Sequence, residues 1–189
     1  MLLQSIYCYT LCRFSLNATE WIHMPILQSE LTRASSRGVI RKSVVARSGQ
    51  PTAFLCHSHL DRTLAEGLQT LLHEAGWEVY IDWQDADMPA SPNRVTASRI
   101  QSRIVSADWF LFLATANSTA SRWCPWEIGY ADGKKPVGRI AVIPTTDTSG
   151  RHHGNEYLQL YQQITPADVG GLALFPAGQT TGGSFVKNL

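Results

Sequence analysis

The chain has 189 residues, of which 44% are hydrophobic and 16% charged, and its formal net charge at pH 7 is +1. This hydrophobic fraction excludes a disordered chain. No apolar run reaches about 18 residues, which excludes a membrane-spanning helix, and the low net charge gives no electrostatic reason to bind nucleic acid. We expect one soluble domain with residues to spare, because a single core seldom needs more than about 150.

The charge is distributed unevenly along the chain. Residues 1–50 carry six basic and two acidic side chains, a net +4, so the remainder sums to −3. The apolar stretch 1–21 lacks a charged n-region and a small-residue cleavage site, so we expect neither a signal peptide nor a membrane anchor there. Residues 32–50 are small and basic and end in Gly-Gln-Pro, which is typical of a linker. The sequence therefore predicts a basic N-terminal extension over 1–50, with apolar spacing near residues 2–14 that is compatible with a helix.

The cysteines and histidines give no sign of a metal site. Cys8, Cys12, Cys56 and Cys124 form no CxxC pair and no disulfide framework. We therefore expect reduced thiols in a cytoplasmic protein. The six histidines lack carboxylate or thiolate partners at metal-ligand spacing, so no metal is predicted.

From Pro51 onward, short apolar runs alternate with segments of helical period. In the helix expected over 93–105, Val95, Ile100 and Ile104 are predicted to point inward and the arginines outward. In chain order the pattern predicts a strand at 53–56, a helix at 61–75, a strand at 77–81, a loop at 82–92, the helix at 93–105, a strand at 109–114, a loop at 117–118, a helix at 121–133, a strand at 138–144, a long exposed loop at 145–154, a short helix near 156–163 and an edge strand at 172–175.

Alternating strands and helices imply right-handed crossovers and a doubly wound parallel sheet. The run at 109–114 is apolar at nearly every position, as expected of a central strand covered on both faces. We expect an α/β domain over 51–165, followed by a C-terminal edge strand or tail over 166–189. Ligands are expected outside the carboxyl ends of the strands.

One segment at such an end is dense in reactive side chains, namely SRWCPWE at 121–127. Its proline fits the first turn of a helix. Helical spacing then predicts that Trp123 and Glu127 share a face with Tyr130, opposite a core-directed stripe of Cys124, Ile128 and Ala131. A carboxylate near a helix N-terminus is favoured in its ionised form. Spacing alone leaves open the alternative that Glu127 only pairs with Arg122, Arg99 or Arg103.

Other catalytic patterns are not supported. Ser58 lies between two histidines, but no GxSxG elbow or triad partner set accompanies it. Neither GxGxxG nor GxxxxGK[ST] follows the first strand, so phosphate binding by a glycine loop is not expected.

The segments FLCHSHLD (54–61), LLHEAGWEVYID (71–82) and SADWFLFLATANSTASRWCPWEIGYADG (106–133) together resemble a Toll/interleukin-1 receptor (TIR) domain of the bacterial type. The pattern Ser-x-Trp-Cys-x-x-Glu in a helix after a strand and loop is highly characteristic of that family. The resemblance covers about 115 residues, from Pro51 to about Ile164. It implies a flavodoxin-like sheet of about five parallel strands, with a mobile loop after the second strand, here Asp82–Pro92.

Members of the family either assemble as scaffolds or cleave the nicotinamide–ribose bond of NAD+, and the enzymes carry a glutamate where this chain has Glu127. The resemblance therefore implies an NAD+ hydrolase or cyclase in which NAD+ is the substrate and no cofactor is needed. Trp123 would form an aromatic wall for nicotinamide. Ser58 and Asp82 would contribute to the pocket rim, with His57 and Trp83 nearby.

Family analogy also implies self-association and a role in anti-phage signalling, in which the nucleotide product activates a separate effector protein. The loop after the second strand departs from the family pattern, because it is acidic and rich in proline and lacks a clear glycine turn. The alternative function is a noncatalytic TIR interaction module, which would not require Glu127 together with Trp123.

Overall fold

The computed structural model describes residues 24–38, 49–89, 91, 93–154 and 156–189. The helix compatible with residues 2–14 lies outside these ranges, as does most of the predicted linker at 32–50. No helix in the described part of the chain is long and apolar enough to cross a membrane.

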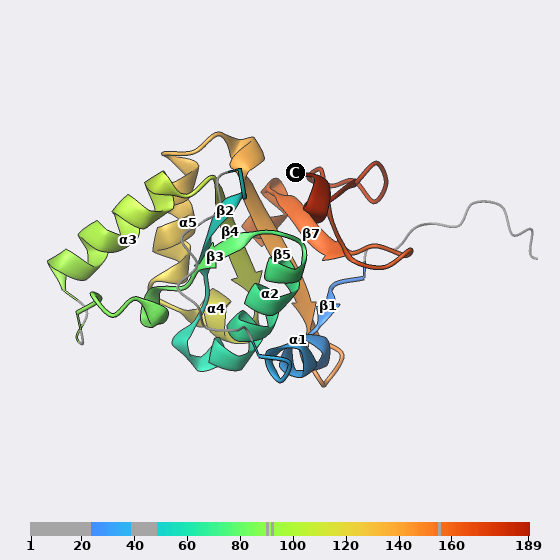
Figure 1. Cartoon of the computed structure of the whole chain (residues 1–189), viewed down its shortest axis with the longest axis horizontal. Coiled ribbons are helices and arrows are strands. Elements are labelled where there is room, and N and C mark those ends of the chain that lie inside the picture. The colour runs from blue at the N-terminus through green and yellow to red at the C-terminus, as the bar shows by residue number, and fades with distance from the viewer. Residues whose placement is uncertain (1–23, 39–48, 90, 92, 155) are drawn as a thin grey trace, which may run out of the picture.

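The centre of the molecule is a mostly parallel sheet with the order β3-β2-β4-β5-β7-β8-β9 (Figure 1). The five strands β2, β3, β4, β5 and β7 are all parallel, and numbered among themselves they lie in the flavodoxin-like order 2-1-3-4-5, which confirms the predicted fold class. β8 and β9 extend the sheet in antiparallel fashion. The bounds are β2 Thr52–Cys56, β3 Glu78–Tyr80, β4 Trp109–Ala114, β5 Ile140–Thr146, β7 Gln162–Pro166, β8 Leu172–Phe175 and β9 Ser184–Phe185.

Helices cover both faces of the sheet, and each face has its own core (Figure 1). Successive residues of β2 alternate between the two cores, as the period of a strand requires: Ala53 and Leu55 pack with α1 and α2, whereas Phe54 and Cys56 pack with α3 and α5. The helices are α1 Gln28–Ser35, α2 Arg62–Glu74, α3 Arg94–Ser106, α4 Ala116–Ala120 and α5 Cys124–Asp132, joined by 3-10 turns η1 His59–Asp61, η2 Asp82–Gln84, η3 Val137–Arg139, η4 Glu156–Leu160 and η5 Val186–Asn188.

Three local predictions around the third and fourth strands are wrong. Residues 117–118 lie inside α4 rather than in a loop, because Thr115 and Ser118 form a capping box that starts a helix. The helix predicted from Ser121 begins at Cys124, since the Ser121 hydroxyl caps its first turn by accepting from two backbone N–H groups. Val95 is 53% exposed rather than inward. It lies in the first turn of α3, beyond the edge of the sheet (Figure 1).

Two further predictions, between the end of β5 and β8, are also wrong. The loop expected at 145–154 contains the end of β5 and the two-residue strand β6 His152–His153, which pairs antiparallel with it. The short helix expected near 156–163 is only the 3-10 turn η4, and the chain then enters β7. β7 supplies the fifth parallel strand, because Gln162 and Gln163 pair with the start of β5.

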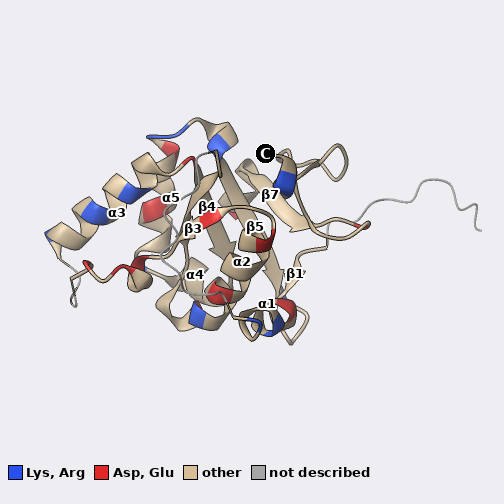
Figure 2. Cartoon of the chain, in the orientation of Figure 1, with Lys and Arg blue, Asp and Glu red and all other residues tan. Residues whose placement is uncertain are grey.

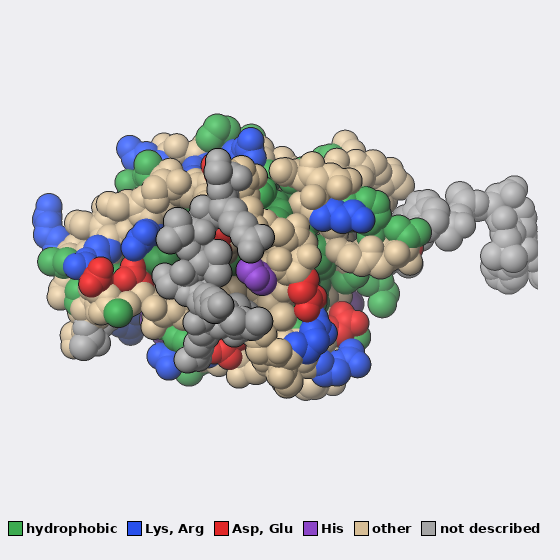
Figure 3. Space-filling view, in the orientation of Figure 1, with side chains coloured by type: hydrophobic (Ala, Val, Ile, Leu, Met, Phe, Trp, Pro, Cys, Tyr) green, Lys and Arg blue, Asp and Glu red, His purple; other side chains and the backbone are tan. Residues whose placement is uncertain are grey.

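The segment before the linker contains elements that the composition did not reveal. β1 Ile26–Leu27 pairs in parallel with the end of β5, and α1 packs against α2. The linker prediction is therefore wrong at its start, because residues 32–35 belong to α1. Acidic and basic side chains lie next to one another over this region (Figure 3), and Arg37 is paired with Glu74 at 3.2 Å.

The contact between α1 and α2 depends on Gly67. A Cβ at this position would lie 1.9 Å from the carbonyl oxygen of Leu31, which is backbone and cannot turn aside. Gly67 thus lets the two helices approach closely, and the buried side chains of Leu31 and Ala34 complete the contact.

We predict that Gly67→Ala lowers the free energy of unfolding by about 2–3 kcal/mol, because α1 must move off α2 and lose buried contacts. Denaturant unfolding followed by circular dichroism measures this loss. The matched control is Gly129→Ala in α5, where a Cβ meets nothing within 4 Å and the better helix propensity of alanine leaves stability unchanged or raised. Equal unfolding midpoints for the two variants would contradict the proposed role of Gly67.

Candidate active site

The candidate site lies at the carboxyl ends of β2 and β4, where the strand order reverses. The chain leaves β2 for β3 on one side, while β4 lies on the other. In open α/β sheets this switch point is where ligands bind, because the two crossover connections diverge there. The loops that border it begin at His57 after β2 and at Thr115 after β4.

A buried carboxylate fastens these two loops together. Asp61 accepts a hydrogen bond from the hydroxyl of Thr115 at 2.5 Å and another from the side-chain amide of Asn117 at 2.6 Å. Thr115 and Asp61 are both buried. The same Thr115 oxygen accepts from the backbone N–H of Ser118, which starts α4. This network fixes both sides of the switch point, and no sequence motif indicated it.

His57, Asp82 and Trp83 lie close together at the end of β2. His57 Nδ1 lies 3.1 Å from the carbonyl oxygen of Leu55, and the indole N–H of Trp83 donates to His57 Nε2 at 2.9 Å. A carbonyl only accepts and an indole N–H only donates, so the imidazole is neutral with its proton on Nδ1. Burial lowers the pKa of His57, and the nearby Asp82 carboxylate, 3.9 Å from Nε2, opposes that shift. The hydrogen bond between Trp83 and His57 attaches the start of the 82–92 loop to the end of β2.

Ser58 is buried at the same edge, where its hydroxyl caps η1 by accepting from the backbone N–H of Leu60 at 3.3 Å. This is a structural contact that leaves the hydroxyl proton available to a ligand. The guanidinium of Arg62 lies over the ring of Trp83, 5.1 Å from its centroid, and so covers one face of the indole.

Glu127 is the most unusual group of the site. It lies in the first turn of α5, and only 6% of its surface is exposed. The pKa of Glu127 is raised to about 8, first by burial and then by the neighbouring Cys124 and Asp82, while a hydrogen bond with Cys56 acts to lower it. The expectation of an ionised carboxylate is therefore wrong for the free protein, because desolvation outweighs the helix dipole.

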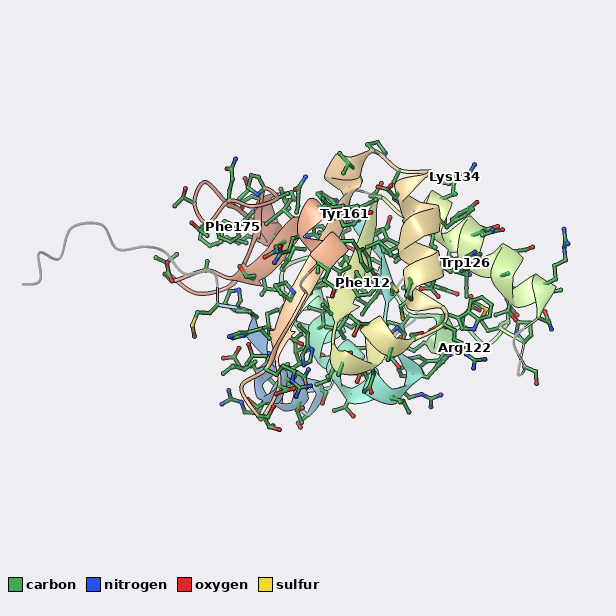
Figure 4. All side chains as sticks on the ribbon, turned by 180° about the vertical axis from the view of Figure 1, so that it is seen from behind. Phe112, Arg122, Trp126, Lys134, Tyr161 and Phe175 are labelled. Carbon is green, nitrogen blue, oxygen red and sulfur yellow. The ribbon has the colours of Figure 1, made fainter. Side chains whose placement is uncertain are left out.

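The predicted faces of α5 also need correction. Glu127 lies on the buried side with Cys124, Ile128 and Ala131, rather than opposite them. The outer face carries an aromatic row in which Trp126 contacts the rings of Trp123 and Tyr130, at centroid distances of 5.4 and 6.0 Å. Figure 4 shows Trp126 on the side of α5 that faces α3. Trp123 is half-buried at the start of this row.

The arginine pairing left open by the sequence is not seen. Arg103 is paired with Asp85 at 3.0 Å, and Arg99 donates to the carbonyl oxygen of Asp87. No ion pair between described residues includes Glu127. Basic side chains lie along α3, and acidic ones lie in the loop before it (Figure 2). The arginines of α3 therefore neutralise the acidic side chains of that loop and not Glu127.

Tyr157 in η4 is a site residue that the sequence did not indicate. Its side chain is 41% exposed, and its pKa is raised first by partial burial and then by the thiols of Cys56 and Cys124. Glu156 before it has a φ of 59°, a conformation that non-glycine residues adopt rarely. The chain therefore turns sharply just before Tyr157. Residue 157 is far from residues 56 and 124 in the sequence, so no local pattern could relate them.

The chemistry of the site is thus that of one buried carboxyl group without a cation beside it. With its pKa at about 8 the group holds a proton at neutral pH and can donate a hydrogen bond, whereas a ligand with positive charge favours its ionised form. Within the described ranges, no group of three or more His, Cys, Asp or Glu residues is placed to hold a metal ion.

Comparison with known proteins places this geometry in a family. A family model described as "TIR domain" matches residues 53–172. The "Probable 3' cyclic ADP-D-ribose synthase ThsB'" of Bacillus cereus (strain MSX-D12) is 34% identical over 120 residues, which cover 61% of this chain and 61% of that protein. The matched part is therefore less than two thirds of the relative's length.

The raised pKa of Glu127 makes stability depend on pH. The folded state keeps a proton that the unfolded state loses above its ordinary pKa of 4.5, so stability is lost as pH rises from about 4.5 to about 8. We predict that Glu127→Gln does not lose stability in this way. Its free energy of unfolding should exceed that of the wild type by an amount that grows by up to about 1.4 kcal/mol for each pH unit between these two values.

Urea unfolding at pH 5 and pH 8 measures the effect. The control is Glu30→Gln on the exposed side of α1, which should show the same pH dependence as the wild type. Parallel stability curves for wild type and Glu127→Gln would show that Glu127 is ionised in the folded protein.

Proposed function

Because this chain belongs to the TIR domain family, we propose that it cleaves the bond between nicotinamide and ribose in NAD+. The observation that carries the proposal is the carboxyl group of Glu127, buried at the switch point with no cation to neutralise it. The name of the similar Bacillus cereus protein, a cyclic ADP-ribose synthase, supports the same substrate class.

The reaction needs a group that favours positive charge. Nicotinamide is bound to ribose as a cation, and when the bond from its ring nitrogen to ribose C1′ breaks, the bonding electron pair goes to nicotinamide and positive charge moves onto the ribose. An ionised Glu127 stabilises both the bound cation and the oxocarbenium-like state that follows. No acid is needed to protonate the leaving group, in contrast to the hydrolysis of O-glycosides. Binding of the cation thus shifts Glu127 toward its ionised form and releases a proton.

The other predicted site residues surround this carboxylate in the proposal. Trp123 provides an aromatic wall for the nicotinamide ring, while Ser58 and Asp82 contribute polar atoms at the rim. His57 and Trp83 hold the 82–92 loop against the end of β2 through their hydrogen bond. NAD+ is the substrate in this scheme, and no cofactor takes part.

We propose a cyclic product rather than free ADP-ribose. Water attack on ribose C1′ gives ADP-ribose, whereas attack by a hydroxyl or ring nitrogen of the same molecule gives a cyclic isomer. A carboxyl group as deeply buried as Glu127 is in a site that restricts water, which favours the internal nucleophile. The printed name of the Bacillus cereus relative, a 3' cyclic ADP-D-ribose synthase, supports this outcome.

We further propose that the product serves as a signal in anti-phage immunity and activates a separate effector protein. Self-association would use α3 and the 82–92 loop, the family's usual assembly region. Val95 and Val105 are both more than half exposed on α3 and offer apolar contacts for such an assembly. The same valines favour the second candidate function, a noncatalytic interaction module.

Release of nicotinamide from NAD+ by concentrated protein tests the leading proposal. We expect Glu127→Gln to reduce the rate at least about 100-fold, because the amide matches the carboxyl group in shape but cannot carry negative charge. Glu30→Gln, far from the site on α1, is the matched control and should keep the wild-type rate.

Equal rates for wild type and Glu127→Gln would refute the role of Glu127. No release by the wild type, even when it is assembled at high concentration, would favour the interaction module. The mass of the second product separates the two chemistries, since ADP-ribose exceeds its cyclic form by one water.

A further inference from the structure

The hydrogen bond between Trp83 and His57 can form only while the imidazole is neutral. The indole N–H donates to His57 Nε2 at 2.9 Å, and Nδ1 lies 3.1 Å from the carbonyl oxygen of Leu55. A neutral imidazole has one donor and one acceptor nitrogen, and both are already used by these two partners. A second proton turns Nε2 into a donor, so that two N–H groups would point at one another. Protonation of His57 therefore breaks its contact with Trp83.

A replacement partner for the protonated ring lies next to Trp83. Oδ1 of Asp82 is 3.9 Å from His57 Nε2, and it accepts at present from the backbone N–H of Trp83 at 2.8 Å. A carboxylate that moved about 1 Å closer would form a charge-assisted hydrogen bond with the protonated ring. Asp82 and Trp83 are consecutive residues of η2, so the carboxylate can approach Nε2 only as the indole leaves it. Protonation thus exchanges a neutral partner for a charged one.

The turn η2 has a second attachment, which does not titrate. The side-chain amides of Gln84 in η2 and Gln69 in α2 exchange two hydrogen bonds, at 3.0 and 3.1 Å. Gln69 also donates to the carbonyl oxygen of Val79 in β3 at 2.9 Å. These amides stay neutral at any pH at which the protein is folded. Protonation of His57 therefore releases η2 from the end of β2 while the turn stays attached to α2.

The groups around His57 determine the pH at which this happens. The charged or titratable ones on the elements packed against it are His59 and Asp61 in η1, Asp82 in η2 and Arg62 at the start of α2, over the ring of Trp83. Burial has the largest effect and lowers the pKa of His57 from its ordinary value of 6.5, and His59 acts in the same direction, while Asp82 and Asp61 oppose them. The ring is therefore neutral at pH 7, and it takes up a proton only as the pH falls below 6.5.

We propose that His57 is a positioning residue that works as a pH-sensitive switch: its neutral ring holds the Trp83 indole at the end of β2, and a proton on Nε2 makes Asp82 take the place of Trp83. The effect on catalysis rests on the proposed function, in which Asp82 and Trp83 border the site. The protonated form moves both residues and so leaves the border of the site incomplete.

Nuclear magnetic resonance of the full chain, with 15N in its tryptophans, follows this contact without any substrate. The signal of the Trp83 indole is identified by its loss in Trp83→Phe. It should shift along a titration curve between about pH 7.5 and about pH 5, the range in which a histidine changes its charge. The buried indole of Trp77 is the internal reference, because it donates to the carbonyl oxygen of Val186 at 2.9 Å and that acceptor does not titrate.

The same substitution at two neighbouring histidines separates the switch from a general effect of acid. A glutamine at position 57 can accept from Trp83 and donate to the Leu55 carbonyl but takes up no proton, so His57→Gln should abolish the titration of the Trp83 signal. His59→Gln is the matched control, since His59 is exposed and its ring centroid lies 6.2 Å from that of His57. It should keep the titration, with a midpoint that is unchanged or slightly higher.

The pH profile of nicotinamide release from NAD+ is the second readout. The logarithm of kcat/KM should rise with a slope of about one per pH unit up to about pH 8, because Glu127 must lose its proton. Below the midpoint of the Trp83 signal the slope should steepen to about two, since a second proton then inactivates the enzyme. His57→Gln should keep the slope of about one throughout, whereas His59→Gln should follow the wild type.

A Trp83 titration that disappears in His57→Gln and persists in His59→Gln supports the proposal. A Trp83 signal that does not shift while circular dichroism shows a folded protein overturns it, as does a titration that survives in His57→Gln. If His57→Gln does not fold, a histidine ring signal of His59→Gln must share the midpoint of Trp83, and its absence overturns the switch. The indole signal needs no NAD+, so a wild type that cleaves none overturns the proposed function alone, and the indole titration still decides on the switch.

Discussion

A carboxyl group held away from water, with no cation beside it, is the constraint on which the rest of this site depends. Glu127 reaches that position because the 2-1-3-4-5 strand order brings the end of β2 under the first turn of α5. Burying a carboxylate without a partner is costly, so the group keeps its proton and its pKa rises to about 8. Among its neighbours, Cys124 raises the pKa further toward the protonated form, and the opposing effect of Cys56 is smaller than that of burial.

Such a carboxyl group is useful only if its surroundings do not rearrange, and two pairs of contacts provide this rigidity. Asp61 joins the loops after β2 and β4 through Thr115 and Asn117. The indole N–H of Trp83 is donated to His57, which in turn donates to the backbone of β2. Both connections use neutral or already satisfied groups, so neither places a positive charge next to Glu127.

The sequence predicted the parts of this structure that follow from local pattern. The strand at 109–114 was located to the residue because every position is apolar, and the resemblance in 121–127 identified the segment that carries Glu127. Periodicity could not decide which side of α5 faces the core, since a tryptophan and a glutamate four residues apart fit either side. Burial of Glu127 against Cys56 is a contact between β2 and α5, and no local pattern reports it. The same holds for Tyr157 and for Gly67, whose roles depend on partners far away in the sequence.

The protonated state of Glu127 also determines which ligands the site distinguishes. A neutral ring, such as a reduced dihydronicotinamide, meets a carboxylic acid and gains one hydrogen bond. An oxidised nicotinamide ring carries positive charge and meets the same group as a carboxylate, once the cost of ionisation has been met by the attraction between the two charges. In the proposed cleavage of NAD+, that attraction persists as the charge passes from nicotinamide to ribose, so it acts on the transition state and not only on the bound substrate. A carboxylate already ionised in the free protein would lose this dependence, because it would attract any cation. In the proposed reaction, the raised pKa of Glu127 therefore links recognition of the oxidised ring to the chemical step.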